Sequence, residues 1–511
     1  MDFMENLKNT LGEEFNVSVT ENGAVGYRTS GKELLDINFA VSSLRNESEV
    51  SIEKRFAKAF YEDKILAIKW LFYAGDVRGG LGERRLFRIG LKWLAKNERG
   101  MLIKLIPLVA EYTRWDNLLC LLDENDEKLT AIVSATLKNQ LNSDMENMAQ
   151  KKPISLCAKW MPSVNASSKE TRKYAKLLAY TFGISEREYR KMLSALRAYL
   201  DVVEVKMSKK EWNAIEYSAV PSRANLIYND AFLSHDEVRR RQYLASLEKG
   251  ETKINAGTLF PHDIVHQFSK EMRNWQDPTG NKTLEELWKA LPDYVKENGN
   301  TICVSDGSGS MSWATVGNTK VTPLEVANAL SIYFAERSSG QFKDKYITFS
   351  SRPQLVDFSH CNSLRDKIKI ALSHSECSNT NVEAVFDLIL ATAVKSQMKQ
   401  EDMPKNILIL SDMEFDSCAT ASNGRLNEKL FSTIAKRYAE YGYSLPRLVF
   451  WNICSRTGTI PVKENKLGVA LVSGFSPAIV KMVLSNQTDP FQCLLEQLND
   501  ERYAPVEQAL R

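Results

Sequence analysis

Short apolar runs separated by amphipathic helical segments fill the chain after about residue 298, and this alternation restricts the possible folds more than any other feature. Three of the runs have the length and composition of strands buried on both faces: residues 301–305 (TICVS), 406–410 (NILIL) and 447–451 (RLVFW). Residues 322–325 (TPLE) combine a capping box with Pro in the first turn, so they predict a helix that runs through Ser338. Strands that alternate with helices in this way predict a doubly wound parallel sheet.

The chain before about residue 297 has a different pattern, in which apolar residues recur at helical spacing and alternating strands are scarce. Residues 84–94 are one example, with an apolar face made of Leu86, Ile89, Gly90, Trp93 and Leu94. Arg84, Arg88 and Lys92 fall on the opposite face. The change of pattern predicts an α-helical domain at 1–297 and an α/β domain at 298–511, with a linker at 297–300.

The composition is that of an ordinary globular protein, with 43% hydrophobic and 26% charged residues among 511. The first residues include acids and no continuous apolar core, so they do not have the pattern of a secretory signal, and no stretch of about 18 apolar residues follows. The eight cysteines form no C-x-x-C pair, which argues against a disulfide scaffold and against a zinc site. We expect a soluble cytoplasmic protein without a membrane partner.

The positive charge of the chain is concentrated in its first part. A net charge of +3 does not by itself indicate nucleic-acid binding, but residues 151–200 hold eleven Lys or Arg against three acids, whereas residues 301–511 hold 22 of each. Ser167 and Glu170 have the spacing of a capping box, and the helix after them would carry a stripe of four cations: Lys169, Arg172, Lys173 and Lys176. Like charges at this spacing disfavour a helix slightly, so the stripe indicates an anionic partner. A solvated helix face is the alternative.

Side chains with oxygen atoms follow two of the predicted strands. The strand at 301–305 runs into Asp306-Gly307-Ser308-Gly309-Ser310, and Asp412 follows the strand at 406–410. Ligand sites in open α/β sheets form at the carboxyl ends of the strands. Two carboxylates and two hydroxyls, completed by water, are an all-oxygen set that suits Mg²⁺ or another divalent cation.

This arrangement resembles the metal-ion-dependent adhesion site of von Willebrand A domains. The matching positions are Asp306, Ser308 and Ser310 for the D-x-S-x-S motif, Thr380 for a middle loop, and Asp412 for the last strand. Asn381 and Met413 depart from the pattern, because Asp and Gly are frequent there, and these departures bear on loop shape and metal affinity. The resemblance implies a cation that binds a carboxylate of a partner, which is docking rather than catalysis. A vestigial site that only ties loops together is the alternative.

A helical domain followed by a von Willebrand A domain resembles the Ro autoantigen family, and most closely a divergent branch of that architecture whose domain has no assigned function. The likeness covers nearly the whole chain and is carried by residues 75–84 (GDVRGGLGER), 196–201 (LRAYLD) and 220–222 (VPS). It implies that residues 1–297 form a TROVE-type ring of HEAT-like helical repeats, completed by the von Willebrand A domain at 298–511. It also implies a ribonucleoprotein that holds small or misfolded RNA with little sequence preference.

Phosphate contacts in such a protein would come from basic side chains of the helical part. The candidates are Arg78, Arg84, Arg88, Lys92, Lys159, Lys169, Arg172, Lys173 and Lys176. Trp160 and Tyr174 are candidates for stacking on unpaired bases, and packing in the core is the alternative for both.

The sequence shows no catalytic apparatus. His262 and His266 have the i, i+4 spacing of zinc ligands, but the Glu that metalloproteases need after the first His is absent. The glycine-rich residues 75–82 lack the G-K-[ST] ending of a phosphate-binding loop and follow a helix, which favours a tight turn between helices. The sequence therefore favours a non-enzymatic RNA-binding scaffold with a Mg²⁺-dependent docking site. A metal-dependent protein adaptor without RNA is the alternative, and a metal-dependent nuclease is a third, weaker hypothesis.

Overall fold

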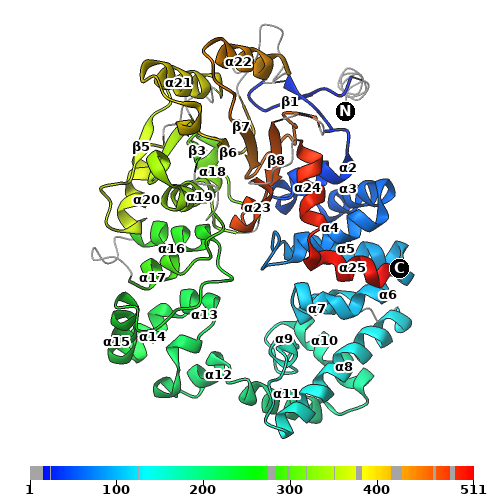
Figure 1. Ribbon diagram of the computed structural model, residues 1–511. Helices are drawn as coiled ribbons and strands as arrows, with labels where there is room; N and C mark the ends of the chain where they lie inside the picture. Colours follow the sequence, from blue (N-terminus) through cyan, green and yellow to red (C-terminus); the bar gives the residue numbers. More distant parts are fainter. Residues whose placement is uncertain are drawn as a thin grey trace. The chain divides into compact units, whose positions relative to one another are not determined.

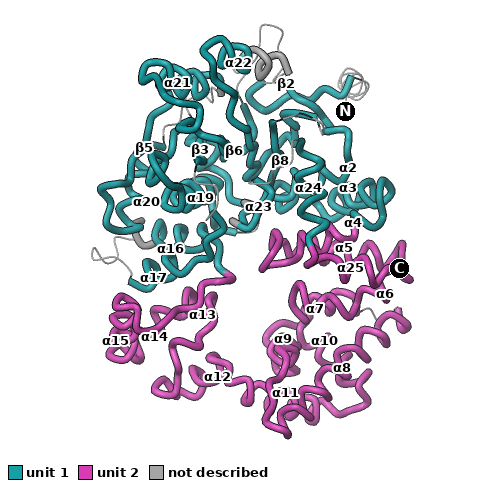
Figure 2. Tube along the Cα trace, viewed as in Figure 1, with its two compact units in different colours: residues 1–67, 259–500 teal, residues 68–258, 501–511 magenta. Residues whose placement is uncertain are grey.

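The structure is a computed structural model of the full chain. It describes residues 15–23, 25–122, 126–273, 282–295, 300–317, 319–349, 352–375, 382–415, 428–463, 466, 468–483 and 489–511. The chain forms two compact units, which Figure 2 colours separately. Unit 1 comprises residues 1–67 and 259–500, and unit 2 comprises residues 68–258 and 501–511. These units divide the chain at other points than the predicted boundary at 297/298, and most of the predicted linker lies outside the described residues.

A six-stranded sheet in the order β5-β4-β3-β6-β7-β8 is the centre of unit 1 (Figure 1). Its strands are β3 (Thr301–Asp306), β4 (Lys345–Phe349), β5 (Leu355–Asp357), β6 (Asn406–Ser411), β7 (Arg447–Asn452) and β8 (Val469–Ser473). The three predicted strands are β3, β6 and β7. They pair in parallel with their neighbours and are buried almost throughout. The prediction of a wholly parallel sheet was wrong at one edge, because β5 runs antiparallel to β4. The chain between these two strands is too short for the crossover that a parallel pair requires.

The helices of unit 1 pack around this sheet. They are α2 (Glu33–Ala40), α3 (Glu49–Glu62), α16 (Pro261–Arg273), α17 (Lys282–Lys289), α18 (Ser310–Trp313), α19 (Pro323–Arg337), α20 (Leu364–Ser373), α21 (Val382–Lys395), α22 (Glu428–Glu440), α23 (Val480–Val483) and α24 (Pro490–Leu498). The predicted helix is α19, with Thr322 as its N-cap and Glu325 closing the capping box. It packs on β3, β4 and β6, and this position explains why it is buried over nearly its whole length.

The N-terminal residues belong to the sheet's unit because they pack on β8 and on the loops beside it. The small strands β1 (Ser18–Val19) and β2 (Val25–Gly26) pair with each other, and Tyr27 bridges to Ile460. After α2, the hydroxyl of Ser42 donates to the carbonyl oxygen of Asn452 at the end of β7. These contacts join the beginning of the chain to loops that the sequence places more than 400 residues away.

Unit 2 is built from helices, in agreement with the helical pattern of the sequence. They are α4 (Lys64–Gly75, whose first residues belong to unit 1), α5 (Arg84–Asn97), α6 (Arg99–Leu105), α7 (Val109–Tyr112), α8 (Glu127–Ala149), α9 (Cys157–Trp160), α10 (Lys169–Phe182), α11 (Glu186–Tyr199), α12 (Val203–Ser208), α13 (Ser222–Ile227), α14 (Asn229–His235), α15 (Glu237–Glu248) and α25 (Ala504–Leu510). The apolar face predicted for residues 84–94 is buried on α5.

The predicted start of the helix at residue 167 was wrong by one residue. Ser168, not Ser167, is the N-cap of α10, and its hydroxyl accepts from the backbone N–H of Thr171. The extended backbone at Ser168 places its side chain over the first turn, and this geometry removes Glu170 from the capping role.

The glycine-rich segment 75–84 is a tight turn between α4 and α5, as the sequence predicts. The backbone N–H of Leu81 donates to the carbonyl oxygen of Tyr73, and that of Glu83 donates to Ala74. A Cβ atom on Gly80 would lie 1.9 Å from the Tyr73 oxygen, so only glycine fits there. The fully buried Asp76 pairs with Arg502, which ties the C-terminal segment 501–511 to this turn.

Among the described residues, no helix combines the length and the apolar character that crossing a bilayer requires.

Candidate metal centre and basic surface

The candidate metal site lies where the strand order of the sheet reverses. The next strand along the chain, β4, pairs with one edge of β3. The later strand β6 pairs with the other edge of β3. Because β3 and β6 are parallel neighbours, Asp306 at the end of one and Asp412 just after the other lie at the same edge of the sheet. Reversal points of this kind are the usual ligand sites of open α/β sheets.

Four of the five predicted ligands come together in the structure. The backbone N–H of Ser308 donates to Oδ1 of Asp306 at 2.9 Å, and the hydroxyl oxygens of Ser308 and Ser310 lie 3.0 Å apart. The hydroxyl of Ser310 also hydrogen-bonds the carboxylate of Asp412. The fifth residue, Thr380, lies outside the described residues, as does Asn381.

The electrostatics of the site favour a bound cation. Both carboxyl groups are buried, with exposed fractions of 0% for Asp306 and 1% for Asp412. Burial, together with the negative charge of Asp412, raises the pKa of Asp306 to about 7. Burial likewise raises the pKa of Asp412. A divalent cation would relieve the cost of keeping two adjacent carboxylates charged in this environment.

The donor set fits a hard cation that keeps several water ligands. The converging side chains offer two carboxylates together with hydroxyl oxygens, whereas no group of three or more His, Cys, Asp and Glu side chains that could hold a metal converges within the described part of the chain. Mg²⁺ binds through few protein carboxylates and retains water. The residues present therefore fit Mg²⁺ better than zinc, which favours nitrogen and sulfur.

Two charged residues beside the site are not identified by the sequence patterns. Nη1 of Arg456 lies 3.0 Å from Oδ2 of Asp412, and the buried Glu414 accepts from the backbone N–H groups of Arg456 and Thr457 at 2.7 and 2.9 Å. Between the two acids, Met413 has a φ of 62°, a left-handed conformation that glycine adopts more readily than other residues. The position of Glu414 two residues after Asp412 is a weak indication at best, and nothing local marks Arg456.

A cluster of four arginines in unit 2 forms the candidate basic surface. The residues are Arg84, Arg88, Arg114 and Arg223, named together here as the arginine cluster. Partial desolvation by neighbouring groups lowers the pKa of Arg84, although the residue is exposed, and the positive charges of Arg114, Arg88 and Arg223 lower it further. The negative charge of Asp116 opposes this shift. The positive charges that act on Arg84 therefore come from Arg88 on α5, from Arg114 and from Arg223 on α13.

Hydrogen bonds and an aromatic ring position two members of the cluster. Arg88 donates to Asp116 at 2.9 Å and to Asn117 at 2.7 Å. Nε of Arg114 donates to Asp116 at 2.8 Å, and its guanidinium carbon lies 3.7 Å from the ring centre of Trp160. Trp160 is half-buried, so it is neither a core residue nor a fully open stacking platform.

The other predicted basic residues are spread over several elements. Lys92 is half-buried on α5, and Arg78 is exposed in the turn before it. On α10, Lys169 and Lys173 are exposed, Arg172 donates to the carbonyl oxygens of Ala166 and Ser167, and Lys176 lies 3.7 Å from Glu186. Arg172 and Lys176 therefore already have partners nearby, which weakens the α10 stripe as a phosphate-binding site.

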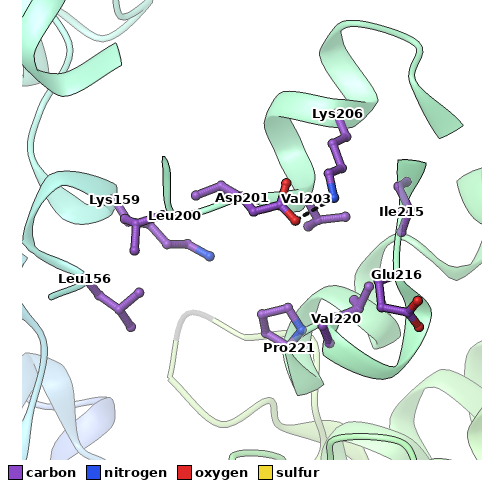
Figure 3. Close-up of a pocket in the computed structure, with 12 residues that line it drawn as sticks. Leu156, Lys159, Leu200, Asp201, Val203, Lys206, Ile215, Glu216, Val220 and Pro221 are labelled. Atoms are coloured by element: carbon purple, nitrogen blue, oxygen red, sulfur yellow. Dashed lines mark hydrogen bonds and ion pairs between the residues drawn. The ribbon is translucent and has the colours of Figure 1, made fainter. Parts of the chain in front are cut away.

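A cavity of about 200 Å³ in unit 2 adjoins Lys159 (Figure 3). Figure 3 shows Leu156 on one side and Ile215, Glu216 and Val220 on the other. Parts of two sequence phrases singled out above, at 200–201 and 220–221, contribute to its wall. Lys206 pairs with Asp201 at 2.6 Å, so the cavity offers apolar surface more than free charge.

The two histidines with zinc-ligand spacing do not converge on a common point. Both lie on α16, where Nδ1 of His266 is 2.9 Å from a carboxylate oxygen of Glu325. The ring of His262 instead packs edge-on against Phe475, with ring centres 5.3 Å apart.

Two family models match consecutive parts of the chain. Residues 166–301 match the family described as Domain of unknown function (DUF2828), and residues 300–506 match Domain of unknown function (DUF7788). The solved structure of the Ro (RSR) protein of Deinococcus radiodurans is similar with a TM-score of 0.43 and 13% identity, over 86% of this chain and 92% of that one.

A curated relative extends the likeness over almost the full length. The chain is 30% identical over 528 aligned residues to uncharacterized protein L728 of Acanthamoeba polyphaga mimivirus, and the alignment covers 96% of this chain and 89% of that protein. At this identity and coverage, the chain belongs to the same family as the mimivirus protein L728.

Proposed function

We propose that the protein is a non-catalytic, cytoplasmic RNA-binding scaffold of the Ro type. The observation that carries the proposal is the arginine cluster, in which Arg88 and Arg114 pair with Asp116 and the exposed Arg84 feels the positive charges of the other three arginines. Phosphate groups would offset the mutual repulsion of these arginines, and guanidinium groups bind phosphate through paired hydrogen bonds. The sequence resemblance to the Ro family supports the same function independently of this geometry.

The nature of the surface favours small or misfolded RNA with little sequence preference. Arginine side chains that contact phosphates do not distinguish one base from another. Arg114 and Trp160 lie face to face, and unpaired bases stack on planar groups of both kinds. Single-stranded regions are therefore the expected targets.

Charge reversal at the two exposed members of the cluster tests the RNA-binding proposal. Full-length protein freed of nucleic acid is titrated with single-stranded and structured RNA at low salt in a filter-binding assay. We expect Arg84→Glu combined with Arg223→Glu to weaken binding by about tenfold or more. The control is Lys395→Glu combined with Lys399→Glu, which makes the same charge change at two exposed lysines of unit 1. Equal losses in both pairs, or no binding by the wild type, would contradict the proposal.

We also propose that the site at Asp306 binds Mg²⁺ and serves as a docking point. Asp306, Ser308, Ser310 and Asp412 would hold the cation, and Thr380 is the predicted fifth ligand. When bound, the cation would supply a positive charge with an open position for an acidic group of a partner. The support is the convergence of these oxygens at buried carboxylates with raised pKa values.

The buried carboxylate pair also favours the alternative function, a protein adaptor that works through the metal site without RNA. That hypothesis predicts an acidic protein partner whose binding is lost with chelator and in the Asp306→Ala and Ser308→Ala variants, while the wild type ignores RNA. RNA binding that depends on Arg84 and Arg223 would exclude it. Incubating RNA with Mg²⁺, with Asp412→Ala as the control, tests the nuclease hypothesis.

A further inference from the structure

Arg456 lies between two acids that come from opposite ends of the chain. Nη1 of its guanidinium group is 3.0 Å from Oδ2 of Asp412, and its Nε and Nη2 groups face Glu21. Asp412 is buried, whereas the side chain of Glu21 is 57% exposed. A single guanidinium group therefore divides its charge between a candidate metal ligand and a surface acid.

The loop of Arg456 and the segment of Glu21 are both fixed to the residues that follow Asp412. Glu414 accepts from the backbone N–H groups of Arg456, Thr457 and Glu21, the last at 2.8 Å. The hydroxyl of Thr20 donates to the carbonyl oxygen of Phe415 at 2.7 Å. The backbones of both segments are thus held by hydrogen bonds, so the contact between Arg456 and Asp412 can be lost through side-chain movement while the contact with Glu21 remains.

We propose that Arg456 is the built-in counter-cation of the candidate metal site. In the metal-free protein it pairs with both Asp412 and Glu21, and binding of a divalent cation at Asp412 breaks the first contact and leaves Arg456 paired with Glu21 alone. The inference rests on the proposed metal-docking function and adds a regulatory residue to it. It also links metal occupancy to the N-terminal segment at residues 20–22.

The proposal follows from the charges around Asp412. A guanidinium group and a divalent cation that share one carboxylate repel each other, and burial weakens the screening by water. Glu21 lowers this cost because it still pairs with the guanidinium group after the contact with Asp412 is lost. Removing Arg456 should therefore strengthen metal binding, whereas removing Glu21 should weaken it.

The first experiment measures Mn²⁺ affinity of the full-length protein by electron paramagnetic resonance of the free ion. We expect Arg456→Gln to bind Mn²⁺ about fivefold to tenfold more tightly than the wild type, the size of a partly exposed ion pair. Arg456→Lys keeps the charge and should stay close to the wild type. The matched control is Arg437→Gln, because Arg437 has the same 33% exposure and also pairs with two acids, Glu383 and Asp387.

A double-mutant cycle separates this mechanism from a general effect of charge. Glu21→Gln should weaken Mn²⁺ binding about threefold in the wild type and leave it nearly unchanged in the Arg456→Gln background. Equal effects of Glu21→Gln in both backgrounds, or an Arg456→Gln affinity no tighter than that of Arg437→Gln, would overturn the proposal and leave the metal site intact. Absence of Mn²⁺ binding in every variant would overturn the metal site and the inference together.

Discussion

The hydroxyl of Ser411 donates to Oδ2 of Asp306 at 2.6 Å, across the two central strands of the sheet. This bond orients a buried carboxylate at the candidate metal site and partly opposes the rise in its pKa that burial causes. We expect Ser411→Ala to lower the free energy of unfolding by about 2 kcal/mol at pH 8, because the bond involves a charged group. Urea denaturation measures the change.

The control for Ser411 is another fully buried serine. The hydroxyl of Ser331 on α19 has no hydrogen-bond partner among the described residues. Ser331→Ala should therefore be neutral or stabilising. A loss of equal size in both variants would show that the bond between Ser411 and Asp306 is not the cause.

The buried Asp36, which is not part of the metal site, should make the stability of the protein depend on pH. Burial on α2 raises its pKa from 3.8 to about 6, although hydrogen bonds from Ser30 oppose the rise. The folded protein then holds the proton more tightly than the unfolded chain, so the contribution to stability is complete below about pH 4 and is lost as the pH rises through about 6. Asp36→Asn removes this dependence.

Relative to the wild type, the Asp36→Asn variant should gain about 3 kcal/mol of stability between pH 4 and pH 7. Denaturant unfolding of both proteins at several pH values measures the difference. A constant difference across that range would contradict the expected ionisation of Asp36.

Gly80 and Gly100 test the close packing of the turn at residues 75–84. A Cβ atom on Gly80 would collide with the Tyr73 carbonyl oxygen, whereas one on Gly100 would meet nothing within 4 Å. We expect Gly80→Ala to destabilise unit 2 by about 3 kcal/mol or more, and Gly100→Ala, within α6, to be neutral or slightly stabilising. Thermal unfolding compares them, and similar midpoints would refute the tight turn.

Arg502 and Arg511 test how the C-terminal segment is held. Nη2 of Arg502 donates to the fully buried Asp76 at 2.9 Å, whereas Arg511 pairs with Glu507 at the surface. Arg502→Met would leave Asp76 buried without its cation and should cost about 3 kcal/mol, while Arg511→Gln should cost well under 1 kcal/mol. Urea denaturation is the measurement, and an equal cost would show that the Asp76 pair contributes little.

The sequence predicts the parts of the fold that depend on local patterns. β3, β6 and β7 are recognisable because they are apolar throughout, and α19 because its capping box and proline are adjacent in sequence. The contacts of the N-terminal segment with β8 and its loops are not recognisable, since they join residues far apart in the chain.

At the two candidate sites, too, local patterns predict some residues but not those that long-range contacts bring in. Asp306, Ser308 and Ser310 form one short motif, and Asp412 ends a clear strand, so these four were predicted together. Arg456 reaches Asp412 from the loop after the neighbouring strand, and its role depends on geometry alone.

Local patterns also predict only part of the arginine cluster. Arg84 and Arg88 occur on the polar face of a predicted helix, whereas Arg114 and Arg223 come from other segments of unit 2. Long-range packing, which no single window of the sequence records, brings the four together.

The salt dependence of RNA affinity tests the central claim most directly. If the arginine cluster binds phosphates, the logarithm of the association constant should fall linearly with the logarithm of the salt concentration. In the Arg84→Gln, Arg223→Gln double variant, the slope should then be smaller by about two, one for each lost phosphate contact. An unchanged slope in this variant, or an affinity that does not respond to salt in the wild type, would contradict the account.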